Sequence, residues 1–204
     1  MRYTGPKARQ CRREGVNLFG APKYAKIMAR RSGVPGMHGG KRGSKMSEYA
    51  KQLREKQKAK RMFCLSEKQF RRAYDRAARS QGVTGDNLLN LLERRLDNVV
   101  YRAGFAVTRM QARQFVSHGL FLVNGRRSDV PSIMVREGDV IEIRPKSRNS
   151  KVFDHNAEEL GDYSAPKWLK VTAKDRKVEI VAMPSSDDYE SLINPQLIVE
   201  FYSR

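Results

Sequence analysis

The chain of 204 residues has little of what defines several large classes of protein. It contains two cysteines, Cys11 and Cys64, which are too few for a disulfide framework or for a zinc site built on four thiolates. No apolar run approaches the roughly 20 residues of a membrane-spanning helix. The first residues, "MRYTGPKARQCRREG", lack the apolar core of a secretory signal. We therefore expect a soluble, cytosolic protein with reduced thiols and no membrane-spanning helix.

Acidic residues are scarce in the first part of the chain. The whole sequence has 41 basic and 22 acidic residues, a net charge of +19, and residues 1–85 hold 23 of the basic residues but only five of the acidic ones. A charge that only keeps a protein soluble has no reason to be so unevenly distributed, whereas a surface that lies along phosphates does. A polyanion is the expected partner, and charge alone does not distinguish nucleic acid from a membrane surface.

Lysine is absent from residues 93–144, although this stretch contains nine arginines. The guanidinium group is planar, so it binds phosphate through two parallel hydrogen bonds and stacks on bases, which an ammonium group does not do. This composition favours recognition of a specific RNA geometry over loose neutralisation of charge.

The first 46 residues show no sustained hydrophobic period. The stretch "SGVPGMHGGKRGSK" (32–45) contains five glycines, and such a segment buries too little apolar surface to offset the entropy of ordering it. It is predicted to be either a flexible linker or a basic arm that becomes ordered on RNA, where glycines let the backbone approach phosphates. The sequence leaves both interpretations open.

Two polar segments after this region predict helices. The first, "SEYAKQLREKQKAKR" (47–61), has good helix formers but few apolar residues, so we expect it to lie in solvent or on a charged partner. The second, "SEKQFRRAYDRAARSQG" (66–82), begins with a capping box from Ser66 to Gln69 and has one apolar stripe. Its other faces carry four arginines, which are predicted to face phosphates: Arg71, Arg72, Arg76 and Arg79.

The rest of the chain predicts a third helix and then a small sheet. An apolar stripe runs from Leu88 to Ala103 and predicts one continuous, buried helix. The stretch "TRMQARQFVSHGLFLVNGRR" predicts a capped helix that leads into a β-hairpin, because Asn124-Gly125 is the strongest short signal for a type I′ turn. Alternating residues in "SIMVREGDVIEIR" (132–144) predict further strands. The expected fold class is α+β, with an all-helical domain and a small antiparallel sheet covered by helices.

The stretch "RRLDNVVYRAGFAVTRMQARQFVSHGLFLVNGRRSDVPSIMVREGDVIEI" (94–143) resembles the S4 RNA-binding domain, which is named after ribosomal protein S4 of the small subunit. The resemblance extends through "RYTGPKARQCRREG", "GMHGGKRGSKMSEYAKQLREKQKAKR" and "TGDNLLNLLERRLDNVVYRAGF" to "LIVEFYSR" at the end of the chain. Many RNA-modifying proteins share the domain motif alone. The flanking segments in this order are similar to those of the bacterial-type ribosomal protein family.

The resemblance implies an organisation in three parts. Residues 1–46 form a flexible basic arm, and residues 47–92 form a helical domain that the C-terminal tail, 190–204, joins. Residues 93–189 form a sheet-containing domain, with the S4 motif at about 93–155.

The resemblance also implies a structural role without catalysis. Members of the family are constituents of the small ribosomal subunit in the cytoplasm, where they bind small-subunit ribosomal RNA early and nucleate assembly. They contact the neighbouring ribosomal protein S5, lie close to messenger RNA at the entrance of its path and influence decoding accuracy, and some repress their own operon.

Position by position, the resemblance assigns RNA contacts to eighteen residues: Tyr3, Lys7, Arg12, Arg13, His38, Lys56, Arg61, Gln69, Arg71, Arg72, Arg109, Gln111, Arg113, Gln114, His118, Asn124, Arg126 and Arg127. The basic composition of the glycine-rich segment adds Lys41, Arg42 and Lys45 to this set.

The zinc site of some family members has no counterpart here. Those members bind zinc through four cysteines near the N-terminus, whereas this region of the chain contains Cys11 alone. One thiolate does not hold a structural zinc ion. We therefore expect no metal and no cofactor, and an arm that depends on RNA for its order.

Several other residues suggest chemistry, but a simpler role is favoured for each. Asp97 follows Arg-Leu as the nucleophile of pseudouridine synthases does, yet its place in a helical stripe favours an ion pair within the helical domain. His118 has no carboxylate near it in sequence, which favours an RNA contact over general-base catalysis. Cys64 and Trp168 are predicted to be core residues, and the acidic run "SSDDYES" (185–191) is predicted to face solvent.

Two other functions remain as alternatives. An RNA-modifying enzyme that uses an S4 domain for binding would need a catalytic domain of about 150 further residues. A membrane-surface or general polyanion-binding protein would show lysine-rich amphipathic helices and would be indifferent to the fold of the RNA.

Overall fold

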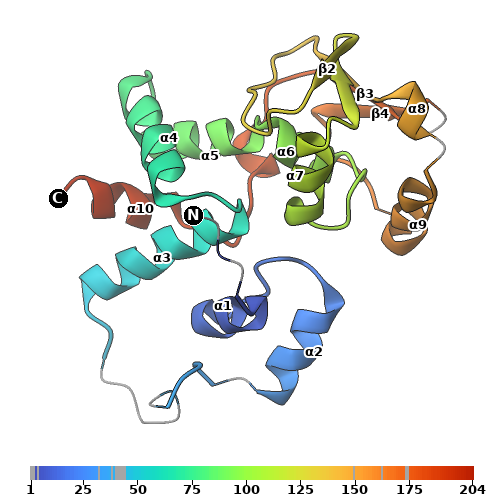
Figure 1. Ribbon diagram of the computed structural model, residues 1–204. Coiled ribbons are helices and arrows are strands. Elements are labelled where there is room, and N and C mark those ends of the chain that lie inside the picture. The colour runs from blue at the N-terminus through green and yellow to red at the C-terminus, as the bar shows by residue number, and fades with distance from the viewer. Residues whose placement is uncertain are drawn as a thin grey trace. The chain divides into compact units, whose positions relative to one another are not determined.

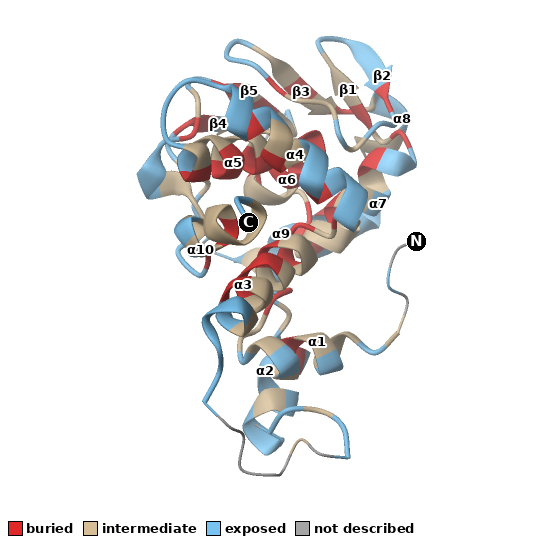
Figure 2. Cartoon of the chain, turned by 90° about the vertical axis from the view of Figure 1, so that its left-hand side faces the viewer, coloured by how far each residue is buried: buried red, intermediate tan, exposed pale blue. Residues whose placement is uncertain are grey.

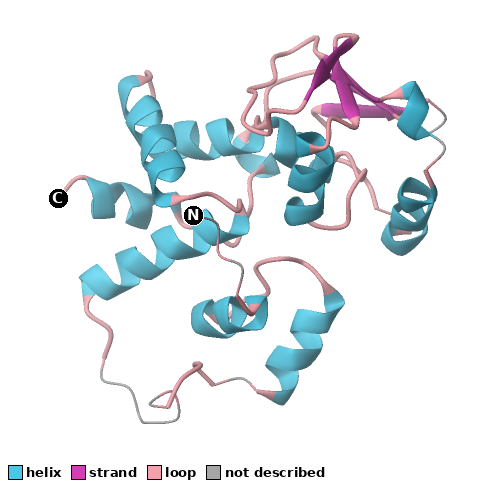
Figure 3. Cartoon of the chain, in the orientation of Figure 1, coloured by secondary structure: helices cyan, strands magenta, loops and turns pink. Residues whose placement is uncertain are grey.

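The computed structural model describes residues 3, 5–31, 33–37, 39, 45–148, 150–161, 163–172 and 175–204. The chain divides into two compact units, which we call the helical unit (Met1–Leu88 with Glu190–Arg204) and the sheet unit (Leu89–Tyr189). Figure 3 shows the five-stranded sheet of the second unit in magenta. The expected α+β fold class is confirmed. The division falls after Leu88, whereas the sequence placed the end of the helical domain at residue 92.

Helices make up the regular structure described in the helical unit (Figure 1). They are α1 (Lys7–Glu14), α2 (Pro22–Arg30), α3 (Glu48–Met62), α4 (Glu67–Arg79), the first half of α5 (Thr84–Glu93) and α10 (Pro195–Tyr202). The first two lie where the sequence showed no period. They are short and share a small core of four buried residues, Cys11, Leu18, Phe19 and Tyr24. Short helices owe their stability to packing rather than to propensity. These two helices have too few apolar positions to produce a periodic pattern in the sequence.

The polar helix α3 lies in neither of the two environments expected from its sequence. It packs against α10 and buries Gln52, Glu55 and Lys56 on that face. Gln52 Nε2 donates to Glu200 Oε2 over 2.8 Å, and the backbone N–H of Asn194 donates to Glu55 Oε1 over 2.7 Å. The expectation that α3 lies in solvent or on an external charged partner is wrong for this face, because α10 supplies the polar partners.

Helix α4 forms as its sequence predicts. Ser66 Oγ accepts a hydrogen bond from the backbone of Gln69, and the Gln69 side chain accepts one from the backbone of Ser66. Phe70, Tyr74 and Ala77 are buried on one side. The capping box and the apolar stripe are therefore both confirmed.

The sheet unit contains a five-stranded antiparallel sheet with the strand order β2-β1-β3-β5-β4. Its elements are the end of α5, α6 (Leu96–Arg102), α7 (Arg109–Ser117), β1 (Phe121–Val123), β2 (Arg126–Ser128), β3 (Val140–Ile143), α8 (Pro145–Arg148), α9 (Lys151–Leu160), β4 (Leu169–Thr172), β5 (Lys177–Ile180) and the 3-10 turn η1 (Ser186–Asp188). Asn124 and Gly125 join β1 to β2 with φ of 50° and 76°. Both angles are positive, as a type I′ turn requires, so the predicted hairpin is confirmed.

The continuous helix predicted from Leu88 to Ala103 is wrong. The chain leaves the helix at Arg94 and Arg95, which separate α5 from α6. There the backbone pairs with the segment around Met134: Leu96 N–H donates to Ile133 O over 2.8 Å, and Val135 N–H donates to Arg94 O over 2.9 Å. This pairing also corrects the strand expected around Ile133, which forms an isolated bridge rather than a strand of the sheet.

The core of the sheet unit lies between the sheet and α6, α7 and α9. Its fully buried residues include Phe121, Ile141 and Val178, which come from the three central strands (Figure 2). Trp168 is 3% exposed and belongs to this core, as predicted. Cys64 is different, because it is only half-buried and adopts a left-handed conformation at the end of α3, where a core position was expected. None of the described helices is long and apolar enough to cross a membrane.

Candidate nucleic-acid interface

The arginines of α4 lie outside its buried stripe. Arg71, Arg72, Arg76 and Arg79 are all exposed. Arg71 Nε donates to Asp75 over 3.0 Å, and its guanidinium carbon lies 4.9 Å from the centre of the Tyr202 ring. One side of α4 therefore presents a row of guanidinium groups, while the other side anchors the helix in the core.

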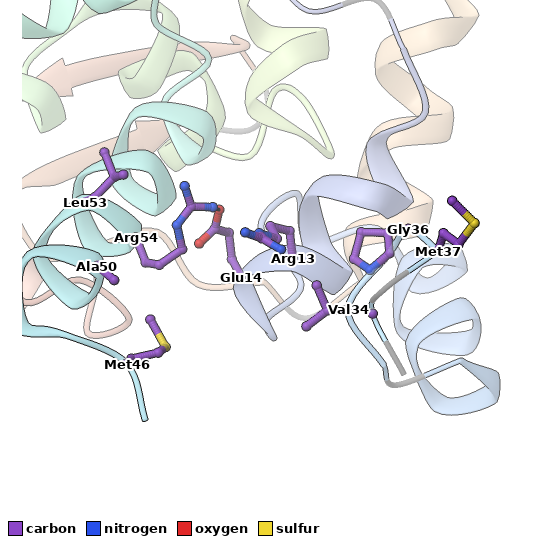
Figure 4. A pocket seen from close by; sticks show the side chains of 11 residues that line it. Arg13, Glu14, Val34, Gly36, Met37, Met46, Ala50, Leu53 and Arg54 are labelled. Carbon is purple, nitrogen blue, oxygen red and sulfur yellow. Dashed lines mark hydrogen bonds and ion pairs between the residues drawn. The ribbon is translucent and has the colours of Figure 1, made fainter. Parts of the chain in front are cut away.

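A buried carboxylate links α1 to α3. Figure 4 shows the side chain of Glu14 between those of Arg54 and Arg13, beside a pocket of about 770 Å³. Glu14 Oε1 accepts hydrogen bonds from Arg54 Nη1, over 3.3 Å, and from Arg61 Nη1. Burial raises the pKa of the Glu14 carboxyl, against the pull of the two arginines, and burial also lowers the pKa of Arg61.

A second carboxylate, Glu67, binds Lys56, which was predicted to contact RNA, and Lys60, for which no role was predicted. It accepts hydrogen bonds from Lys56 over 2.8 Å, from Lys60 over 2.7 Å and from the Tyr202 hydroxyl over 2.9 Å. Burial alone would raise the pKa of Glu67, but these three hydrogen bonds outweigh it and lower the pKa to about 2. Burial and the bond to Glu67 raise the pKa of Tyr202. Since its side chain is only 7% exposed, Lys56 is held inside the protein in this structure.

In the sheet unit, α7 carries the predicted Arg109 and Arg113, and both are fixed by polar partners. Arg113 Nη1 donates to Asp97 Oδ2 over 2.8 Å, and Arg95 donates to both oxygens of Asp97, over 3.0 and 2.9 Å. Arg109 Nε donates to Asn98 Oδ1 over 2.8 Å. Its guanidinium carbon lies 4.5 Å from the centre of the neighbouring Tyr101 ring. The two arginines are therefore held in defined positions, as planar recognition of phosphate requires.

Glu93 supports the same region from the end of α5. The Glu93 side chain is 1% exposed, and its carboxylate accepts two hydrogen bonds from Arg102, over 2.9 and 2.8 Å. It also accepts one from Asn98 Nδ2 over 2.6 Å. Since Asn98 in turn binds Arg109, one network of hydrogen bonds connects a buried acid to a predicted RNA-binding arginine.

The remaining candidates of the sheet unit are exposed, bonded within the fold or, in the case of Asn124, both. Arg126 and Arg127 are exposed on β2, and Gln114 and His118 are exposed on and just after α7. The side chains of two others are used within the fold: Gln111 Nε2 donates to Asn156 over 3.0 Å, and Asn124 Nδ2 donates to Asp139 over 2.8 Å.

The arm residues lie in several environments. Lys7 Nζ donates to the carbonyl of Tyr3 over 2.6 Å and lies 5.1 Å from the centre of its ring. Arg12 Nε donates to Gly33 O over 3.0 Å, while Arg13 is exposed. Lys45 and the capping residue Gln69 are also exposed. His38, Lys41 and Arg42 lie outside the described residues.

The structure places Asp97 as the centre of an ion pair rather than as a nucleophile. Its side chain is 7% exposed and is bound by Arg95 and Arg113. The predicted ion pair is therefore confirmed, but its partners lie in the sheet unit and not in the helical domain where it was expected.

The thiol of Cys11 is placed poorly for metal binding. It is fully buried, and burial raises its pKa, which favours the protonated form that does not bind metal. Among the residues that the structure describes, no group of three or more histidine, cysteine, aspartate or glutamate side chains is arranged to hold a metal ion.

Sequence reasoning missed the acids that orient the cations. No sequence motif marks Glu14, Glu67 or Glu93, because the partners of each lie at a distance in the sequence and meet it only in the folded chain. Glu14 alone left a signal, as the single acidic residue among the first 46. An isolated acid in a basic segment is worth testing as an ion-pair partner.

Comparison with known proteins identifies the family. Residues 2–93 match the family described as "Ribosomal protein S4/S9 N-terminal domain", and residues 94–141 match the "S4 domain". Two relatives, each named "Small ribosomal subunit protein uS4", come from Syntrophomonas wolfei subsp. wolfei (50% identical) and Halothermothrix orenii (51% identical). Both alignments cover 100% of this chain and 99% of the relative. A third relative of that name, from Borrelia turicatae, is 48% identical over 97% of this chain and 96% of its own length. The chain therefore belongs to the S4 family of ribosomal proteins.

Proposed function

We propose that this chain is a structural constituent of the small ribosomal subunit in the cytoplasm, where it binds small-subunit ribosomal RNA. The full-length relatives carry the name of a small-subunit protein, and the family is one of structural ribosomal proteins rather than enzymes. The observation that carries the proposal is the arrangement of arginines. Those of α4 and β2 are exposed, while Arg109 and Arg113 on α7 are fixed by side chains of the same unit.

Within this role, the chain binds the RNA early and nucleates assembly. Arginines that are already oriented lose little conformational entropy on binding, so no other protein has to arrange them first. The resemblance to the family supports contacts with ribosomal protein S5 and with messenger RNA near the entrance of its path, an influence on decoding accuracy, and repression of its own operon in the manner of some members. The chain departs from the zinc-binding members of the family, and its having only two cysteines supports folding without zinc.

The test is co-sedimentation of the purified chain with small ribosomal subunits in high salt. Specific contacts to folded RNA should survive salt that removes loosely held basic proteins, because only part of their free energy comes from counterion release. Loss of the chain from the subunits at moderate salt would contradict the proposal.

A competition experiment separates this function from general binding to polyanions. A folded fragment of small-subunit ribosomal RNA should compete for the chain more effectively than duplex DNA or vesicles of anionic lipid at equal phosphate concentration. Equal competition by all three would favour the polyanion-binding alternative.

A further inference from the structure

The basic arm contains one acid, and that acid is buried. Residues 1–46 include 12 lysines and arginines but only one carboxylate, Glu14. Its side chain is 2% exposed, and it accepts hydrogen bonds from Arg54 and Arg61 of α3. Glu14 is the last residue of α1, so this contact fixes the end of α1 against α3.

Stability alone is a weak reason for such an arrangement. Removing a carboxylate and two guanidinium groups from water costs free energy that their attraction repays only in part. The raised pKa of Glu14 and the lowered pKa of Arg61, both caused mainly by burial, have the directions expected from this cost. What the contact provides instead is geometry, because it fixes two long, flexible cationic side chains relative to α1.

The two arginines stay accessible while they are held. Each uses its Nη1 atom for the bond to Glu14, and the side chains of Arg54 and Arg61 remain 26% and 24% exposed. The neighbouring Arg13 is exposed. The three guanidinium groups would otherwise repel one another, and the carboxylate of Glu14 pairs with two of them.

We propose that Glu14 is a positioning residue of the RNA interface: it docks the arm on α3 and orients Arg54 and Arg61, so that RNA meets an assembled cationic surface. This inference rests on the proposed function. It names a residue that affects RNA binding through the arginines that it positions. Within the arm, α1 is joined to α3 by the bonds from Arg54 and Arg61 to Glu14.

Positioning and simple electrostatics predict opposite results for Glu14→Gln. The substitution raises the net charge by one, so a purely electrostatic surface would bind RNA more tightly. If Glu14 positions the arginines, its loss weakens binding to folded RNA while binding to an unstructured oligonucleotide stays equal or increases. The matched control is Glu48→Gln, which removes the same charge from an exposed position of α3. Glu48 pairs there with Lys51 three residues further along the helix, and an exposed pair of this kind contributes little to stability.

The experiment measures dissociation constants for a folded small-subunit ribosomal RNA fragment and for oligouridylate, each over a range of salt. For Glu14→Gln we expect affinity for the folded fragment to fall about tenfold, which corresponds to 1.4 kcal/mol, with no loss for oligouridylate. Glu14→Asp keeps the charge but shortens the side chain, so it should also weaken binding to the folded fragment. Unchanged or tighter binding of the folded fragment by both variants would overturn the proposal.

A second measurement reports docking directly. Cys11 lies in α1 and is fully buried, so its reaction with a thiol reagent is slow while the arm is docked. In a Cys64→Ser background, Glu14→Gln should speed this reaction several-fold in the absence of RNA, whereas Glu48→Gln should not. An unchanged rate for Glu14→Gln would contradict the docking role.

Failure of this inference is distinguishable from failure of the proposed function. If the unsubstituted protein does not prefer the folded fragment over oligouridylate, the proposed function is wrong. If it does, and Glu14→Gln behaves like Glu48→Gln, then only the role of Glu14 is wrong.

Discussion

The two units carry charge in different ways. The helical unit has 24 basic and 8 acidic residues, whereas the sheet unit has 17 and 14. In the helical unit, the arginines of α4 are exposed on a helix surface. In the sheet unit, Arg109 and Arg113 are half-buried and bonded to Asn98 and Asp97. The comparison indicates that the exposed arginines of α4 are suited mainly to attraction, whereas the arginines of α7 are also held in fixed orientations.

The largest effect is expected where orientation depends on a buried acid. Asp97→Ala would leave Arg95 and Arg113 without their shared carboxylate in a site that is mostly buried. Unpaired buried charges of this kind cost about 3 kcal/mol. Urea unfolding followed in the sheet unit should show this loss, while Asp129→Ala, at an exposed position, should change stability little. Equal stability of the two variants would show that Asp97 has no supporting role.

The second prediction separates attraction from orientation directly. Arg72→Ala on α4 should weaken RNA binding and flatten its salt dependence by about one unit, without loss of stability, because Arg72 is exposed. Arg109→Ala and Arg113→Ala should flatten the salt dependence to the same degree and also destabilise the fold by about 1 kcal/mol. Titrations at several salt concentrations, combined with thermal unfolding, measure both quantities. If Arg72 and Arg113 give the same pair of results, the distinction between α4 and α7 fails.

The third prediction concerns acid stability of the helical unit. Glu67 has a folded-state pKa of about 2, below its value in an unfolded chain, so its ion pairs stabilise the fold above about pH 4.5 and are lost as the pH falls toward 2. Because its side chain is 48% exposed, solvent screening leaves an effect of about 1 kcal/mol. Glu67→Gln should therefore reduce stability at pH 7 and make the acid transition less steep. Parallel pH profiles for the two proteins would contradict this assignment.

The smallest effect is expected from metal removal. Treatment with a strong chelator should leave circular dichroism and thermal unfolding unchanged, because Cys11 is the one cysteine in the N-terminal region. One equivalent of zinc per chain in the purified protein, by elemental analysis, would contradict this prediction.

Local signals in the sequence predicted much of the fold. The capping box at Ser66 and the turn at Asn124-Gly125 are confirmed, because each depends on residues only a few positions apart. The helix break at Arg95 was not predictable in this way, since it depends on backbone pairing with Met134. The polar face of α3 was misread for the same reason, because its partners lie in α10, far along the chain.

The candidate interface divides in a similar manner. Composition indicated which residues carry the charge, and the arginine-only stretch 93–144 contains the fixed arginines. Composition did not show that Lys56 and Gln111 are bonded within the protein, which depends on Glu67 and on Asn156. The direction of a long side chain depends on the residue that it contacts in the folded protein, and the sequence alone does not identify that residue.

The sequence by itself determined the chemistry of this protein: its excess of cations, its preference for arginine in one stretch, and the helices and hairpin that local hydrogen bonds specify. Only the tertiary structure decided which cations are held and by which acid, as with Arg61 by Glu14 and Arg113 by Asp97. The physical reason is range. Capping and turn formation act between near neighbours in the chain, whereas a buried ion pair forms only when packing brings distant residues together and removes water around them.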